Sequence, residues 1–196
     1  NGTAGRTVSH NLGVAPEMMW VKKRNEASDW AVYHSWADAT EPEDYFLKLN
    51  DTQVAVNSAT RWNDTAPTSS VFTVGTSGLT NDPNDTYIAY LFASLDGVSK
   101  VGSYTGTGVA GLEVDCGFTT GARFFLVKRA EGTGSWYLWD SGRGITAGND
   151  PYLALDSTAA EFAVDIVDPL NAGIIINSTS TALNGSGEKY IFYAIA

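Results

Sequence analysis

The sequence predicts an all-β protein made of two tandem, duplicated β-sandwich repeats of a jelly-roll-like type. Its apolar runs are short and are bounded by Gly, Asn, Asp, Ser and Thr, as is typical of strands joined by turns. No stretch of a dozen residues has a helical period, and "STAAEFAV" from Ser157 is the best candidate for a turn or two of helix. The two halves of the chain also match each other segment by segment.

The internal match rests on two aromatic segments, "SDWAVYHS" and "GSWYLWDS". Superimposing them places Trp30 on Trp136, a shift of 106 residues, and the same shift brings "VKK" onto "VKR" and "FLKLN" onto "YLALD". Towards the end of each half the shift becomes 103, so that "VFTV" from Val71 meets "IIIN" from Ile174. Loops tolerate such deletions, whereas chance would not keep several segments in order, so the pattern indicates one unit present twice.

The repeats are expected at residues 1–95 and 96–196, with residues 96–113 forming a junction that leads into the second. The junction "DGVSKVGSYTGTG" has no counterpart ahead of the first repeat. Either a segment precedes Asn1 in the parent polypeptide, or the first repeat borrows this strand from elsewhere. Because the chain opens without Met, we expect a fragment of a longer polypeptide, with Ala196 at its C-terminal end.

Each half contains the same series of expected strands, rich in β-branched and aromatic residues and separated by turn formers. In the first half they are "EMMWVKK", "WAVYH", "YFLKL", "SVFTV" and "TYIAYLFASL". Their partners in the second half are "RFFLVKR", "WYLWD", "YLAL", "GIIIN" and "KYIFYAIA".

Strand alternation sorts the aromatic side chains between two faces. In "WAVYH", Trp30 and Val32 share one face and Tyr33 lies on the other. In "WYLWD", Trp136 and Trp139 likewise lie on opposite faces. We predict that Trp30 and Trp136 anchor the cores. Tyr33 and Trp139 would then face a neighbouring domain, a second chain or a ligand.

The charge excludes one class of partner. The chain has 22 acidic and 12 basic residues, a net charge of -10, and a nucleic-acid interface needs a clustered basic face. The dense basic run "KKR" at residues 22–24 is interpreted as a solvated strand end. A single cysteine, Cys116, excludes an internal disulfide, and no apolar run reaches membrane-spanning length.

No catalytic constellation stands out, and we expect a non-enzymatic protein. His34 and Ser35 are neighbours on one strand, so their side chains point to opposite faces and cannot form a nucleophile–base pair. The carboxylates fall mostly in polar loops, where solvated turns are the simpler interpretation.

No cofactor is expected, apart from a weak case for calcium. The loops "TNDPNDT" and "GNDPYLALD" offer the oxygen ligands that Ca²⁺ prefers, at Asp82, Asp85 and Asp150. Neither loop matches an EF-hand, and Asx-Pro is itself a turn former. Zinc is disfavoured because one Cys and two distant His make no ligand cluster.

Aromatic residues in expected loops are the best binding candidates. Trp36, Trp62 and Tyr45 lie at strand ends or in polar connections. Exposed Trp and Tyr rings stack on sugars and anchor protein interfaces. The alternative is that these rings close the ends of each sandwich.

Several segments of the second half resemble a repeat found in structural proteins of tailed bacteriophages, especially marine ones. They are "VGSYTG", "DCGFTTGARFFLVKR", "GSWYLWDSGRG", "NDPYLAL" and "YIFYAIA", and the residues that fit are Tyr104, Phe118, Lys128, Arg129, Trp136, Asp140, Arg143 and Tyr152. The first half departs from the pattern, since His34 stands where Asp140 does and no Arg follows it. The similarity extends over nearly the whole chain, and the motif carries no known catalytic role.

The resemblance implies an extracellular virion surface protein. Its implied partners are other virion proteins or a host cell-surface glycan, and it is expected to form a homo-oligomer, most plausibly a trimer. We expect the distal adhesin of a tail fibre. A capsid decoration (cement) protein and a bacterial carbohydrate-binding module remain alternatives, and copy number per virion separates the first two.

Overall fold

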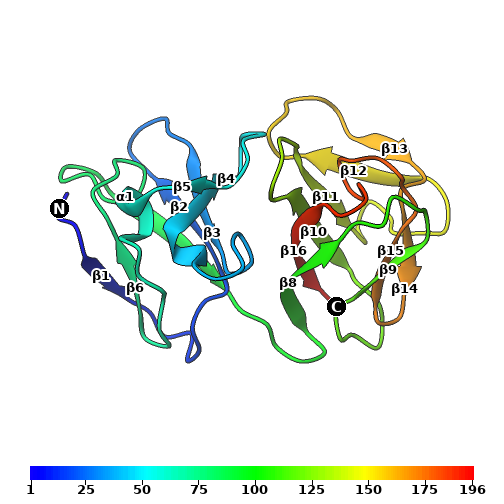
Figure 1. Cartoon of the computed structure of the whole chain (residues 1–196), viewed down its shortest axis with the longest axis horizontal. Helices are drawn as coiled ribbons and strands as arrows, with labels where there is room; N and C mark the ends of the chain where they lie inside the picture. The colour runs from blue at the N-terminus through cyan, green and yellow to red at the C-terminus, as the bar shows by residue number, and fades with distance from the viewer. The chain divides into compact units, whose positions relative to one another are not determined.

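The computed structural model describes all of residues 1–196 and contains two compact units, Asn1–Ala93 and Ser94–Ala196. In both, the regular secondary structure is almost entirely antiparallel strand (Figure 1). The one α-helix, α1, is a single turn, Ala59–Trp62, and no helix has the length and apolar character needed to cross a membrane. The division falls two residues before the boundary expected from the sequence.

The first unit contains a five-stranded and a two-stranded sheet. The larger sheet has the order β5-β4-β3-β2-β7, and in the smaller one β1 pairs with β6. The bounds are β1 Arg6–Ser9, β2 Met18–Lys23, β3 Trp30–His34, β4 Tyr45–Lys48, β5 Val56–Asn57, β6 Val71–Val74 and β7 Tyr87–Phe92, with a 3-10 turn, η1, at Pro42–Asp44.

The second unit contains a six-stranded and a three-stranded sheet. Their orders are β13-β12-β11-β10-β16-β8 and β14-β15-β9. The bounds are β8 Ser99–Thr105, β9 Leu112–Asp115, β10 Phe124–Arg129, β11 Trp136–Asp140, β12 Asp150–Ala154, β13 Phe162–Val164, β14 Val167–Leu170, β15 Gly173–Ile176 and β16 Lys189–Ile195.

Each unit buries one apolar core between its two sheets, which makes it a β-sandwich and confirms the all-β prediction. The core of the first unit consists of Met19, Val21, Ala31, Tyr33, Phe46, Trp62, Phe72 and Val74. The core of the second consists of Val114, Cys116, Phe118, Phe125, Val127, Trp139, Val167, Ile174, Ile176, Leu183, Tyr190, Phe192 and Ala194. In the larger sheets, four strands form a meander and a later strand returns beside the first, an order that differs from the two Greek keys of a jelly roll.

The assignment of aromatic side chains to the two strand faces was wrong. Tyr33 and Trp139 lie in the cores, 3% and 0% exposed, whereas Trp30 is half-buried on the opposite face and stacks on Tyr90 with 6.2 Å between ring centroids. Trp136 is buried, as predicted, but it lies on the strand face opposite the core residue Trp139. Alternation identifies two faces, but both faces of these strands are apolar, so it cannot tell which one is internal.

The helical candidate at residues 157–164 was also wrong. This segment contains no helix, and its last three residues form β13, which pairs with β12. Tyr152 and Phe162 are paired in this ladder and stack with 5.6 Å between ring centroids. Cross-strand aromatic pairing therefore outweighs a weak local preference for helix.

The two units share strand order and equivalent hydrogen bonds. In the first, the Tyr87 hydroxyl donates to the Gly78 carbonyl at 2.8 Å, and in the second the Tyr190 hydroxyl donates to the Thr181 carbonyl at 2.7 Å. The ion pair of Lys23 with Asp85 recurs as Arg129 with Glu188, at 2.7 Å. Equivalent positions are thus found 106 residues apart in the early strands and 103 apart near the end of each unit.

One expected correspondence was off by one residue. Val8 pairs with Phe72, and the matching Val114 pairs with Ile174, so the shift between β6 and β15 is 102. Ile174 therefore corresponds to Phe72 and not to Val71. Because side chains alternate along a strand, the corrected register places the two core residues on the same face.

Two strands occur only in the second unit. β8 pairs with β16 along its whole length, and β14 pairs with β15. In the first unit β7, which corresponds to β16, is the last strand of its sheet.

Candidate functional site

The first unit contains a pocket of about 470 Å³ between its two sheets. Strands β1, β2, β6 and β7 all contribute to its walls. Its apolar lining consists of Val8, Val21, Phe72, Val74 and Ala89. Arg6 and Arg24, both exposed, line it as well. The rest of the lining is polar, and a concave site that combines apolar walls with convergent polar groups is a usual form of binding site.

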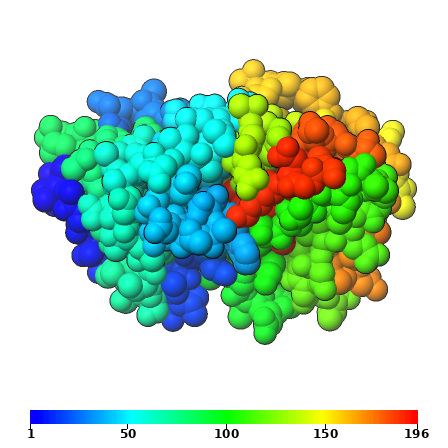
Figure 2. All heavy atoms as spheres, viewed as in Figure 1, coloured from blue at the N-terminus to red at the C-terminus, as the bar shows by residue number.

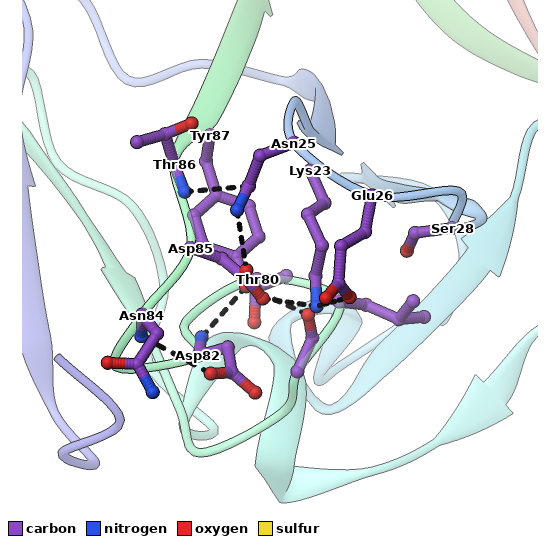
Figure 3. Close-up of polar contacts among 12 residues, drawn as sticks. Lys23, Asn25, Glu26, Ser28, Thr80, Asp82, Asn84, Asp85, Thr86 and Tyr87 are labelled. Carbon is purple, nitrogen blue, oxygen red and sulfur yellow. Dashed lines mark hydrogen bonds and ion pairs between the residues drawn. The ribbon is translucent and has the colours of Figure 1, made fainter.

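A network of polar contacts adjoins this pocket (Figure 3). The Lys23 ammonium pairs with the Asp85 carboxylate and lies 3.3 Å from a carboxylate oxygen of Glu26. The Asn25 amide donates to Asp85 at 2.9 Å, and its oxygen accepts the Thr86 N–H at 3.1 Å. The hydrogen bond from Lys23 lowers the pKa of Asp85, so this carboxylate is held ionised by protein groups.

A buried asparagine connects the border of the pocket to the N-terminal segment. The Asn81 amide donates to the Gly75 and Thr3 carbonyls, both at 2.8 Å. Its oxygen accepts from the amino group of Asn1 at 3.1 Å. Asn184 makes the equivalent bonds in the second unit, accepting from the Thr107 N–H at 2.7 Å. The position of Asn1 thus corresponds to that of Thr107.

A second candidate is the loop after β3, which carries Trp36. Trp36 is 45% exposed, and its backbone N–H donates to Nδ1 of His34 at 3.2 Å. Asp38 accepts from the Thr40 and Glu41 N–H groups at 2.9 and 3.1 Å. In the space-filling view this light-blue segment forms part of the surface (Figure 2). The exposed indole therefore stands on a loop whose conformation is fixed by hydrogen bonds.

Three of the five aromatic residues predicted to bind a partner are core residues. Tyr33, Trp139 and Trp62 are almost completely buried, so they are not available at the surface. Trp62 donates from Nε1 to the Tyr45 carbonyl at 3.0 Å and packs edge-on against Tyr33. Tyr45 is half-buried at the start of β4. Of the predicted set, only Trp36 has an exposed side chain.

The predicted calcium residues do not come together. No group of three or more His, Cys, Asp or Glu side chains could hold a metal ion. Asp85 is paired with Lys23, and Asp82 accepts the Asn84 N–H at 3.3 Å. Asp150 is buried and accepts the Thr146 N–H at 2.7 Å, and burial raises the pKa of its carboxyl.

Sequence reasoning missed the residues around the pocket. Arg6 gave no pattern because it is a single basic residue, and Arg24 was interpreted as part of a solvated strand end. Asn81 could have been found, since the 103-residue shift places it on Asn184. Identical polar residues at matching positions of the two units indicate a shared structural bond.

Comparison with known proteins gives one result. A family model described as Domain of unknown function (DUF7483) matches residues 1–196. Neither a search of curated proteins nor a search of solved structures found a match.

Proposed function

We propose that the chain, which belongs to the family described as Domain of unknown function (DUF7483) over residues 1–196, is a non-enzymatic virion surface protein that binds the host cell, as the distal part of a tail fibre does. The resemblance of its second half to a repeat of tailed-phage structural proteins supports this assignment. Its ligand is a cell-surface glycan, and a homo-oligomer, in particular a trimer, multiplies weak sites into useful avidity.

The observation that carries the proposal is the exposure of Trp36. It is the one tryptophan of six whose side chain is exposed. Its loop is held by Asp38 and His34, so little entropy is lost when a ligand contacts the ring. An exposed indole face fits a sugar, which offers C–H groups to the ring.

Binding of the purified chain to a glycan array and to intact bacteria tests this function. We expect binding by the wild type, and a dissociation constant about tenfold or more higher for Trp36→Ala, the effect of removing a central aromatic contact. Val14→Ala is the matched control, because Val14 is 51% exposed in another loop of the same unit.

Two results would contradict the proposal. Binding to purified capsids without binding to glycans or cells would identify a capsid decoration protein. Release of reducing sugar from host polysaccharide would identify an enzyme.

A further inference from the structure

Strand β7 is an open edge, unlike its counterpart in the second unit. It is the last strand of the five-stranded sheet, whereas β16 lies between β10 and β8. The core-facing residues of β16, Tyr190 and Phe192, are 0% and 2% exposed. At the matching positions of β7, Tyr87 is half-buried and Ala89 is exposed. An uncovered edge presents a row of backbone N–H and C=O groups that can pair with a further strand.

The second unit shows what such a strand does. β8 pairs with β16 and places Tyr104 opposite Tyr190. The two rings stack with 5.0 Å between centroids, and the Tyr104 hydroxyl donates to the Leu183 carbonyl at 2.7 Å. Tyr104 packs against the core, so β8 completes the interior of the sandwich as well as its edge.

The pocket of the first unit occupies the place that Tyr104 fills in the second. Its walls include Tyr87 and Thr80, which correspond to Tyr190 and Leu183, the two contacts of Tyr104. The pocket therefore corresponds to the space that a side chain of β8 fills in the second unit.

The space beside β7 is also wider at one position than the equivalent space beside β16 in the second unit. Gly102 of β8 pairs with Phe192, and a Cβ on this glycine would lie 2.6 Å from the Phe192 ring. In the first unit Ala89 stands where Phe192 does, so the ring is absent and its volume belongs to the pocket. A strand that fits β7 should carry a large apolar side chain where β8 carries glycine.

The backbone at Asn1 indicates from which direction the strand arrives. The Asn1 nitrogen bonds to Asn81 as the Thr107 N–H bonds to Asn184. Thr107 follows β8 after a single residue, Gly106. A strand joined to Asn1 in the same way would reach the edge of β7 directly.

We infer that β7 and the adjoining pocket form an acceptor site for a β-strand of about seven residues that enters immediately ahead of Asn1 in the same polypeptide. Facing the core, this strand carries a tyrosine-like aromatic opposite Tyr87 and a large apolar residue opposite Ala89. This site does not depend on the proposed adhesin function.

Strand grafts joined to the N-terminus of the complete chain test the inference. One graft copies Ser99–Gly106, and a second has phenylalanine in place of the residue copied from Gly102. We expect hydrogen exchange of alternate β7 amides to slow by about tenfold or more with the phenylalanine graft, and less with the glycine graft. A third graft, with serine at the tyrosine position, is the matched control and should give little protection. Exchange in β16 serves as the internal reference for a folded chain.

Equal exchange of β7 in all grafts and in the unextended chain would overturn the inference. So would equal protection by the serine graft, because pairing would then not depend on the pocket. If a free peptide of the same sequence protects β7 and the joined strand does not, the strand that pairs with β7 does not come from the same polypeptide.

Discussion

At the scale of single residues, burial and not residue type decides the role of the aromatic side chains. Trp62 and Trp139 are both buried in cores, and Trp62 also satisfies its N–H with the Tyr45 carbonyl. Trp36 is the same type of residue, but it lies in the loop after β3 and its side chain is exposed. The sequence predicted that all three lie on strands or near strand ends. Their burial depends on which face of the strand packs against the second sheet, and the local sequence does not determine this.

Burial in the core controls the protonation of the Cys116 thiol. It is 4% exposed, and burial raises the pKa of its thiol to about 12 from an ordinary value of 9.0, with a further contribution from Asp115. Since the folded state disfavours the thiolate, this group stabilises the fold fully below pH 9 and loses that contribution as the pH rises towards 12.

Cys116→Ala should therefore reduce the loss of unfolding free energy as the pH rises into the alkaline range. Between pH 8 and pH 10, we expect the wild type to lose about 1.4 kcal/mol more unfolding free energy than the variant. Urea titrations at the two pH values measure the difference, and tyrosines that titrate in the same range contribute equally to both proteins. Parallel losses in the two proteins would show that the thiol is not desolvated.

At the scale of elements, strands with a strong apolar run were predictable and strands without one were not. The segments around β2, β3, β10, β11 and β16 all have a strong apolar run and form strands. Strands β1, β5, β9, β13 and β14 had no such signal, and each is defined by its ladder partner. The pocket escaped prediction for the same reason, since it lies beside β1.

A substitution on the edge strand β7 tests whether the pocket is unfilled space in the core. Ala89→Phe restores in the first unit the ring that Phe192 supplies in the second. We expect a gain of about 0.5–2 kcal/mol in unfolding free energy, the usual range for filling a cavity. Chemical denaturation measures it, and Ile88→Phe on the other strand face is the control. A loss of stability with Ala89→Phe would mean that the pocket cannot take the ring.

At the scale of the whole molecule, the chain consists of two sandwiches with unequal cores. Thirteen buried residues form the core of the second unit, and eight form the core of the first. The second unit also contains β8 and β14, which have no equivalent in the first. The match between the two halves was visible in the sequence, but the difference between the two units was not, since it depends on which edges are covered.

The isolated fragments 94–196 and 1–93 should therefore differ in stability. Fragment 94–196 includes its own β8 and should melt at the higher temperature, because a completed edge buries more apolar surface. Circular dichroism of the two fragments measures this, with the intact chain as reference. A first fragment that melts at or above the second would show that the open edge costs no stability.

The pairing of Gly102 with Phe192, set against Ala89 in the other unit, bears on how such a chain avoids errors while it folds. Neighbouring repeats of similar sequence are prone to exchange equivalent strands during folding. A strand shaped for β16 leaves a void against β7, and a strand that fills the space beside Ala89 would collide with the Phe192 ring. On the inferred acceptor site, moving one bulky group from a strand to its partner would give each unit its own matching strand, so that similarity between the units need not lead to misassembly.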